Sequence, residues 1–498
     1  MPVAPRNKHP VGRLFHDAMN LQPIRSFYQD NITSRYAPPL SCADVEKRIW
    51  QNHRHHACAC NADRCATRCC QRFKQQIEFD MLLRPIRHET ERVSHIRSHN
   101  GEALRRQTNF ADNEAPEFHL LIESARHALR LEPLSSGGGL TVKRAAAMAD
   151  WGVCLDLAES HAVLPLVGKF VRDCSIDLPE QIQKTLNAKL REHAQKTLAL
   201  IAELRRILAL LEKNRVSALA LKGPALSQIV YGFPDLRFFS DLDIYVPHED
   251  RSTAIQCLRD DGYKPLPCVE WYCEAPLRRG TRGPLVDVHW SLSPRYFPAR
   301  LAGPPRHLCL EMDLCESRIR VLPPPMHLLY LCVHAARHGW ESLDQVACIA
   351  GFVRSMSVAD WIAVWSTAEA AGAKKVLACG LSIVNHVFGI PLDSRAQQLL
   401  QANKARLPRL AAQGELKSSS DLLAIHCRLS DTHFRALVYA LAVIFLPTEA
   451  DLESLPTRLI PALLVPKRLI RLLRRHLSGV GQPRLPLSSE RMEGCDRT

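Results

Sequence analysis

The sequence of 498 residues predicts an α+β protein that is mostly α overall, with a small mixed β-sheet flanked by N- and C-terminal helical regions. Three observations predict this class. The composition, 46% hydrophobic and 23% charged, is that of a globular protein. Apolar residues recur at helical spacing before residue 215 and again after residue 322. Between these regions, short strands alternate with helices, as in a sheet layered with helices.

The first segment, residues 1–112, is predicted to be a basic, disordered extension. It lacks sustained periodicity and is rich in Arg, His, Pro and Asn. Within it, the cysteine-rich run HRHHACACNADRCATRCC (53–70) contains no C-x-x-C pair, which a zinc knuckle would need. We interpret the run as part of the extension, with zinc binding as the alternative. Residues 481–498 are predicted to be a second disordered tail.

Residues 113–214 are predicted to form a helical region. The run EFHLLIESARHALRLE (117–132) has helical spacing, and the break SSGGG (135–139) separates it from one or two helices over 143–171. A long amphipathic helix, or a kinked pair, is expected over 178–214, with Pro179 near its start. The first structured unit is therefore expected to be all helical.

Residues 215–300 are predicted to be the α/β core. Strands are expected at RVSALALKG, at DLDIYV and at GPLVDVHWSL. A helix opened by Pro224 and another ending at Gly262 are expected to connect them. These elements together predict a small sheet layered with helices.

Residues 301–480 are predicted to form the C-terminal helical region. Helices are expected over 327–340, 358–389 and 434–446. The basic amphipathic run VPKRLIRLLRRHL (465–477) is expected to pack on its own protein, and binding to an anionic membrane or to nucleic acid is the alternative.

The net charge of +14 comes from the two ends of the chain. Residues 111–454 hold 38 basic and 38 acidic side chains, so the body has no bias toward a polyanion and nucleic acid is an unlikely partner. Association with nucleic acid through the basic tails is the remaining version of that hypothesis. No apolar run approaches the ~20 residues of a membrane span, and the N-terminus has no apolar signal region. We expect a cytoplasmic protein.

The strongest chemical signal is a pair of aspartates in an apolar strand. Because side chains alternate along a strand, Asp241 and Asp243 project from the same face, and Asp287 and His289 share a face of the later strand. Carboxylates placed together repel unless a cation lies between them. Oxygen ligands favour Mg²⁺ or Mn²⁺, and three carboxylates suit a metal site for phosphoryl transfer. An acidic, solvated edge strand is the alternative.

A second signal precedes the aspartates. Lys222 and Gly223 stand between a strand and a helix N-terminus, where a lysine charge, a close backbone approach and free N–H groups suit a phosphate. Pro224 removes one of those donors, and the Walker spacing is absent. Arg237 is placed to bridge a phosphate to the carboxylates. A structural turn and a plain salt bridge are the alternatives for these residues.

The run LALKGPALSQIVYGFPDLRFFSDLDIYV, followed by VDVHWSL, resembles the uncharacterised bacterial nucleotidyltransferase family of the DNA polymerase beta superfamily. The resemblance extends over about residues 116–475 and includes LPPPMHLLYLCVHAARHGWESL. It implies a nucleotidyltransferase fold for the core, with Asp241, Asp243 and Asp287 as the metal-binding and catalytic residues. The nucleotide-binding residues expected from it are Lys222, Gly223, Arg237 and Ser240.

Two departures from the family pattern stand out. The superfamily usually has Gly-Ser or Gly-Gly where this sequence has Gly223-Pro224, and the family tends to carry an Asp where this sequence has Cys348. Three histidines are secondary candidates. His289 is expected to orient a carboxylate or touch substrate, whereas His334 and His338, one helical turn apart, are expected at an interface or in the core, with metal ligation as the alternative.

These observations predict a nucleotidyltransferase that uses Mg²⁺ or Mn²⁺. We expect it to move a nucleoside monophosphate from an NTP to a hydroxyl of a small molecule or protein, releasing pyrophosphate. The alternative is a catalytically inactive protein of the same fold that serves as a binding or scaffold module.

Overall fold

The computed structural model describes residues 115–132, 141–281, 283–402 and 419–446, with the side chains of a few helix-end residues excepted. All described residues belong to one compact unit of the chain. The predictions for residues 1–112, for the break at 135–139, for the helix at 465–477 and for the tail at 481–498 lie outside the described residues.

Helices precede the sheet, as the sequence predicts. They are α5 (Pro116–Ala128), α6 (Val142–Met148), α7 (Trp151–Ser160), α8 (Leu164–Asp173) and α9 (Glu180–Lys213). Residues 143–171 contain parts of three helices rather than one or two, because Asp150 caps α7 by accepting hydrogen bonds from the backbone N–H groups of Gly152 and Val153, and Pro165 opens α8. The long helix α9 is one unbroken element of 34 residues, not a kinked pair.

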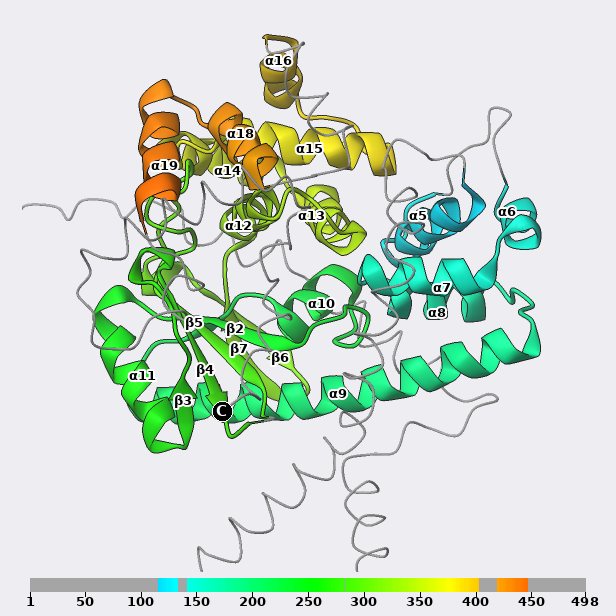
Figure 1. The fold of residues 1–498 in the computed structure, drawn as a ribbon, viewed down its shortest axis with the longest axis horizontal. Helices are drawn as coiled ribbons and strands as arrows, with labels where there is room; N and C mark the ends of the chain where they lie inside the picture. The colour runs from blue at the N-terminus through cyan, green and yellow to red at the C-terminus, as the bar shows by residue number, and fades with distance from the viewer. Residues whose placement is uncertain (1–114, 133–140, 282, 403–418, 447–498) are drawn as a thin grey trace, which may run out of the picture. The chain divides into compact units, whose positions relative to one another are not determined.

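The core is a seven-stranded mixed sheet with the strand order β3-β4-β5-β2-β1-β7-β6 (Figure 1). The strands are β1 (Leu219–Ala220), β2 (Asp241–Tyr245), β3 (Tyr263–Pro265), β4 (Glu274–Arg279), β5 (Leu285–His289), β6 (Leu310–Leu314) and β7 (Ser317–Val321). The three expected strands are β1, β2 and β5. The helices α10 (Gly223–Tyr231) and α11 (Arg251–Asp260) connect them, with short 3₁₀ turns at His248–Asp250, Glu270–Tyr272 and Arg306–Leu308.

The sheet is larger than the sequence predicts. Strands β6 and β7 follow residue 300, inside the range expected to be helical, and β3 and β4 fall where no strand is expected. Pro265 and Pro276 interrupt the alternating pattern of β3 and β4. Because β3 and β6 are the edge strands of the sheet, they tolerate a proline or several exposed charges that central strands would not.

One face of the sheet is apolar and packs on two helices. Helix α9 contacts β2 and β7, and α11 contacts β3 and α9 (Figure 1). The buried cluster between these layers includes Leu204, Ile207, Leu242, Ile244, Leu258, Val286 and Val288. Since side chains alternate along each strand, the aspartates of β2 and β5 must point to the opposite face.

The C-terminal part is helical, as predicted. It comprises α12 (Pro324–Arg337), α13 (Leu343–Ser355), α14 (Val358–Ala371), α15 (Lys374–Phe388), α16 (Ser394–Ala402), α18 (Ser419–Leu429) and α19 (His433–Phe445). These helices share a second, larger core with α5, α7 and α8, and α13 packs against α10. In the described part of the chain, no helix is both long and apolar enough to cross a lipid bilayer.

Candidate active site

The candidate site is built on two neighbouring parallel strands. Strands β2 and β5 pair so that Asp243 is directly opposite Asp287 and Tyr245 is opposite His289. Paired residues project from the same face of a sheet, so the register brings the two carboxylates together. Both aspartates are buried, each with 5% of its surface exposed. The sequence predicted which face each aspartate occupies, and the register supplies their proximity.

Lys222 is the cationic partner of Asp243. Its Nζ lies 3.0 Å from Asp243 Oδ1, and its side chain is only 10% exposed. The antiparallel pairing of β1 with β2 brings it there, because the backbone N–H of Leu221 donates to the carbonyl of Asp243 at 3.0 Å. Burial opposes the charge of the Lys222 ammonium, but the carboxylates of Asp243 and Asp241 outweigh it and raise the pKa of Lys222.

The two facing aspartates differ in protonation. Burial opposes ionisation of Asp243, but Lys222 and His289 outweigh it and hold the pKa of that carboxyl well below its usual range. For Asp287 the balance is reversed, because the charge of His289 only partly offsets the effects that raise its pKa. Burial, together with the charges of Glu274, Asp241 and Asp243, raises the pKa of Asp287 to about 8. The site therefore holds more carboxylates than its cationic side chains offset.

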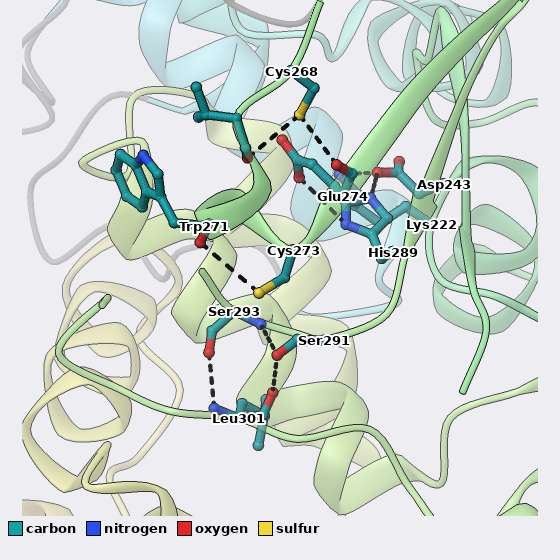
Figure 2. A network of polar contacts seen from close by, with 11 residues as sticks. Lys222, Asp243, Cys268, Trp271, Cys273, Glu274, His289, Ser291, Ser293 and Leu301 are labelled. Carbon is teal, nitrogen blue, oxygen red and sulfur yellow. Dashed lines mark hydrogen bonds and ion pairs between the residues drawn. The ribbon is translucent and has the colours of Figure 1, made fainter. Parts of the chain in front are cut away.

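His289 lies between two carboxylates, as Figure 2 shows. Its Nε2 is 3.0 Å from Asp243 Oδ1, and its Nδ1 is 3.3 Å from Oε2 of Glu274, which is opposite it on β4. Burial lowers the pKa of the His289 imidazole, but the hydrogen bond with Asp243 and the charge of Glu274 raise it overall.

The residues fit a divalent cation. Among the described residues, one group of three His, Cys, Asp or Glu side chains brings its ligand atoms within 4.8 Å of one another, and it consists of Asp243, Asp287 and His289. Oδ1 of Asp287 is buried and has no hydrogen-bond partner among the described residues. A buried carboxylate oxygen without a partner is costly, and a cation beside it would supply the missing interaction. Asp241, also expected as a ligand, is outside this group but contributes its charge.

The turn after β1 has the features expected of a phosphate loop. Gly223 adopts a left-handed φ of +61° at the start of α10, a conformation that other residues rarely adopt. The turn is fixed from α12, where His327 Nε2 donates to the carbonyl of Leu221 at 3.0 Å. Ser240 is exposed directly before Asp241 and so lies at the same edge of the site.

Arg237 is held by a residue that the sequence did not single out. Its Nε donates to Oδ2 of Asp344 on α13 at 3.0 Å, and the pair is mostly buried. Asp344 also accepts from the thiol of Cys348, with Sγ to Oδ1 at 3.7 Å. Cys348 is the position where the resemblance to the family implies an Asp. Asp344, one helical turn before Cys348 on α13, therefore supplies a carboxylate beside Arg237.

Two histidines at the C-terminal end of α12, His334 and the capping residue His338, lie near the site without joining the metal group. The ring centroids of His334 and His338 are 4.7 Å apart, and those of Tyr330 and His334 are 6.1 Å apart. Burial, reinforced by the positive charges of Lys222 and Arg337, lowers the pKa of His334. Neither histidine belongs to the ligand group found among the described residues.

Sequence reasoning missed Glu274, Asp344 and His327. Glu274 begins a strand without clean alternation, and Asp344 falls in the first turn of α13, where an acidic residue normally indicates helix capping. The one available signal for His327 was its place in the run that resembles the family.

Comparison with known proteins identifies one matching family. Residues 147–389 match the model of a family described as uncharacterised nucleotidyltransferase, and this range contains every site residue named above. No curated protein matches the chain.

Two solved structures of the antibiotic-resistance factor ANT(2'')-Ia are similar to part of the chain. The solution structure is 13% identical with a TM-score of 0.28 and covers 35% of this chain and 92% of its own. The crystal structure in complex with adenylyl-2''-tobramycin is 15% identical with a TM-score of 0.22 and covers 36% and 92%. At these TM-scores neither structure indicates a substrate for this chain.

Proposed function

We propose that this chain, whose residues 147–389 match the model of a family of uncharacterised nucleotidyltransferases, transfers a nucleoside monophosphate from an NTP to a hydroxyl acceptor and releases pyrophosphate in a metal-dependent reaction. The observation that carries the proposal is the pairing of Asp243 with Asp287 across two parallel strands. Lys222 contacts the carboxylate of Asp243, whereas a buried oxygen of Asp287 has no hydrogen-bond partner in the part of the chain that the structure describes.

Asp243 and Asp287 would hold the divalent metal, and Asp241 would add negative charge beside them. A bound Mg²⁺ or Mn²⁺ supplies charge neutralisation for the triphosphate and lowers the pKa of a coordinated hydroxyl. Surplus carboxylate in a buried site favours such an ion, because the alternative is to leave like charges uncompensated.

The remaining residues have roles at the nucleotide. Lys222, Gly223 and the N-terminus of α10 form a cationic, donor-bearing turn for the triphosphate, and Ser240 lies at the same edge. Arg237, fixed by Asp344, adds a second cation near Asp241 and Asp243.

In the reaction, the acceptor oxygen forms a bond to the α-phosphorus as the bond to the pyrophosphate oxygen breaks. Asp287, when ionised, accepts the hydroxyl proton. The acceptor is a small molecule or a protein, and its recognition falls to the helices around the sheet.

The direct test incubates the purified full-length protein with each α-labelled NTP, Mg²⁺ or Mn²⁺, and a cell extract as the acceptor source. We expect label transfer and pyrophosphate release that fall by about 100-fold or more in Asp243→Asn and in Asp287→Asn. Asp313→Asn is the matched control, because Asp313 is an exposed carboxylate on β6 of the same sheet. Undiminished transfer by the Asp243→Asn/Asp287→Asn double variant would exclude the proposed site.

The alternative, a catalytically inactive scaffold of this fold, predicts a different result. No labelled product would form with any of the four NTPs, and calorimetry would detect neither NTP nor metal binding. Two departures from the family pattern favour this alternative, Gly223-Pro224 and Cys348. The second is weakened as an argument because Asp344, which contacts Cys348, supplies a carboxylate in the same place.

A further inference from the structure

His289 faces carboxylates with both ring nitrogens. Nδ1 is 3.3 Å from Glu274 Oε2, and Nε2 is 3.0 Å from Asp243 Oδ1. A neutral imidazole has one N–H donor and one lone pair. If the N–H is directed to Glu274, the lone pair of Nε2 points at a carboxylate oxygen, which is repulsive unless a cation is shared between them. The imidazolium form avoids this repulsion by donating to both carboxylates, and a metal ion bound at Nε2 in place of that proton would do the same.

Asp287 independently indicates a ligand at the same place. Its Oδ1 is buried without a hydrogen-bond partner among the described residues, and a carboxylate oxygen of Asp287 lies within 4.8 Å of the ligand atoms of Asp243 and His289. An unsatisfied buried polar atom is destabilising. A cation held by these three side chains would remove that cost and separate the facing carboxylates.

Glu274 has the position of an outer partner of a metal-binding histidine. Ligating histidines usually donate their second N–H to a carboxylate, which fixes the ring and makes its other nitrogen a better ligand. Strand register places Glu274 directly opposite His289, and Figure 2 shows the two side chains in contact. The carbonyl of Cys273 accepts from the N–H of Trp290 at 3.1 Å, which extends the pairing past Glu274. The glutamate is thus held behind the ring by backbone pairing.

We propose that His289 is itself a metal ligand together with Asp243 and Asp287, that Glu274 orients its ring, and that the site therefore prefers a first-row transition ion to Mg²⁺. The inference rests on the metal site of the proposed function and replaces an all-carboxylate ligand set with a mixed one. An imidazole nitrogen favours transition ions, whereas Mg²⁺ favours oxygen ligands alone.

The test uses Mn²⁺ as the probe and measures binding rather than turnover. Chelator-treated full-length protein is titrated with Mn²⁺ by EPR, with Mg²⁺ as competitor, and pulsed EPR of the bound ion detects any directly coordinated ¹⁴N. We expect an imidazole ¹⁴N coupling and an affinity for Mn²⁺ at least about 10-fold above that for Mg²⁺.

Variants assign the coupling to a residue. His289→Asn should abolish the ¹⁴N signal and most of the preference for Mn²⁺. Glu274→Gln should keep the signal and weaken Mn²⁺ binding by about 10- to 100-fold. His307→Asn, an exposed histidine outside the site, should change neither quantity.

The wild-type spectrum decides the inference even if a variant does not fold. Bound Mn²⁺ without ¹⁴N coupling, or no Mn²⁺ binding at all, would overturn it and leave His289 as a hydrogen-bond partner of Asp243. The two proposals fail separately. If the bound ion shows ¹⁴N coupling but the protein transfers no nucleotide, the ligand set is supported and the activity is refuted. If the protein transfers nucleotide with an ion that shows no ¹⁴N coupling, the activity is supported and the ligand set is refuted.

Discussion

Arg237 and Asp344 are 107 residues apart in the sequence and form an ion pair in which Nε donates to Oδ2 across 3.0 Å. The side chains are 13% and 4% exposed. The pair ties the loop before β2 to α13, so the position of Arg237 near the aspartates depends on a helix of the C-terminal region.

Asp344→Ala should destabilise the protein by about 3–5 kcal/mol, because it leaves the guanidinium of Arg237 buried without its partner. Urea denaturation measures the loss. Adding Cys348→Asp to that variant should recover part of it, since Cys348 Sγ is 3.7 Å from the Asp344 carboxylate and is therefore near the same cation. Cys348→Ser in the same background is the control and should recover little. An unchanged free energy of unfolding for Asp344→Ala would show that the pair does not contribute.

Asp243→Asn and Asp287→Asn should have opposite effects on the stability of the metal-free protein. The first removes the charge that pairs with the buried Lys222 and should lower the free energy of unfolding. The second removes a carboxylate whose ionised form is disfavoured by burial and by its acidic neighbours, and should be neutral or stabilising.

The pH dependence of the second effect follows from the raised pKa of Asp287. The folded protein binds this proton more tightly than the unfolded chain, so the contribution of Asp287 to stability falls as pH rises from 3.8 to about 8 and is constant above that. The advantage of Asp287→Asn should therefore be larger at pH 8.5 than at pH 5. Equal destabilisation by both variants would contradict this account.

Acid should destabilise the fold through buried histidines. Burial lowers the pKa of His161, His327 and His426 to about 4. Between pH 6.5 and about 4, these histidines are protonated in the unfolded chain but neutral in the folded protein. The free energy of unfolding therefore decreases as the pH is lowered, by at most about 1.4 kcal/mol per pH unit for each histidine.

Chemical denaturation between pH 7 and pH 4.5 measures that slope. His327→Gln, whose amide can still donate to the carbonyl of Leu221, should reduce it. The exposed His307→Gln is the matched control and should leave it unchanged. The same slope in both variants would remove His327 from the explanation.

Gly223→Ala should impair both stability and nucleotide transfer. Its φ is +61°, yet the nearest atoms to an added Cβ would be 3.8 and 3.9 Å away, so the cost comes from the backbone conformation, about 1 kcal/mol or more. Gly232→Ala at the other end of α10 has φ +78° and no neighbour within 4 Å. Thermal unfolding should show similar losses for both, while only Gly223→Ala should reduce transfer. Equal activity in the two variants would argue against a phosphate role for the turn.

Local rules were sufficient for the helices and for the strands that carry the aspartates. The period of two along DLDIY and LVDVH fixed which residues share a face, and Pro and Gly marked the ends of α10. They failed for β3, β4, β6 and β7. These short strands contain proline or exposed charges, so their alternation is weak, although β3 pairs with nearby β4 and β6 with nearby β7. The pairing of β7 with β1 joins residues distant in the chain, which a sequence window does not contain.

The sequence by itself determined that Asp241, Asp243, Asp287 and His289 occupy polar faces of their strands and that Lys222 and Gly223 end the strand before them. Only the tertiary structure decided that Asp243 is opposite Asp287, that Glu274 lies behind His289 and that Asp344 holds Arg237. The reason is physical. Side-chain direction follows from the local backbone. Register and ion pairing depend instead on how separate segments of the chain pack against one another, and that packing is set by the burial of the whole apolar core.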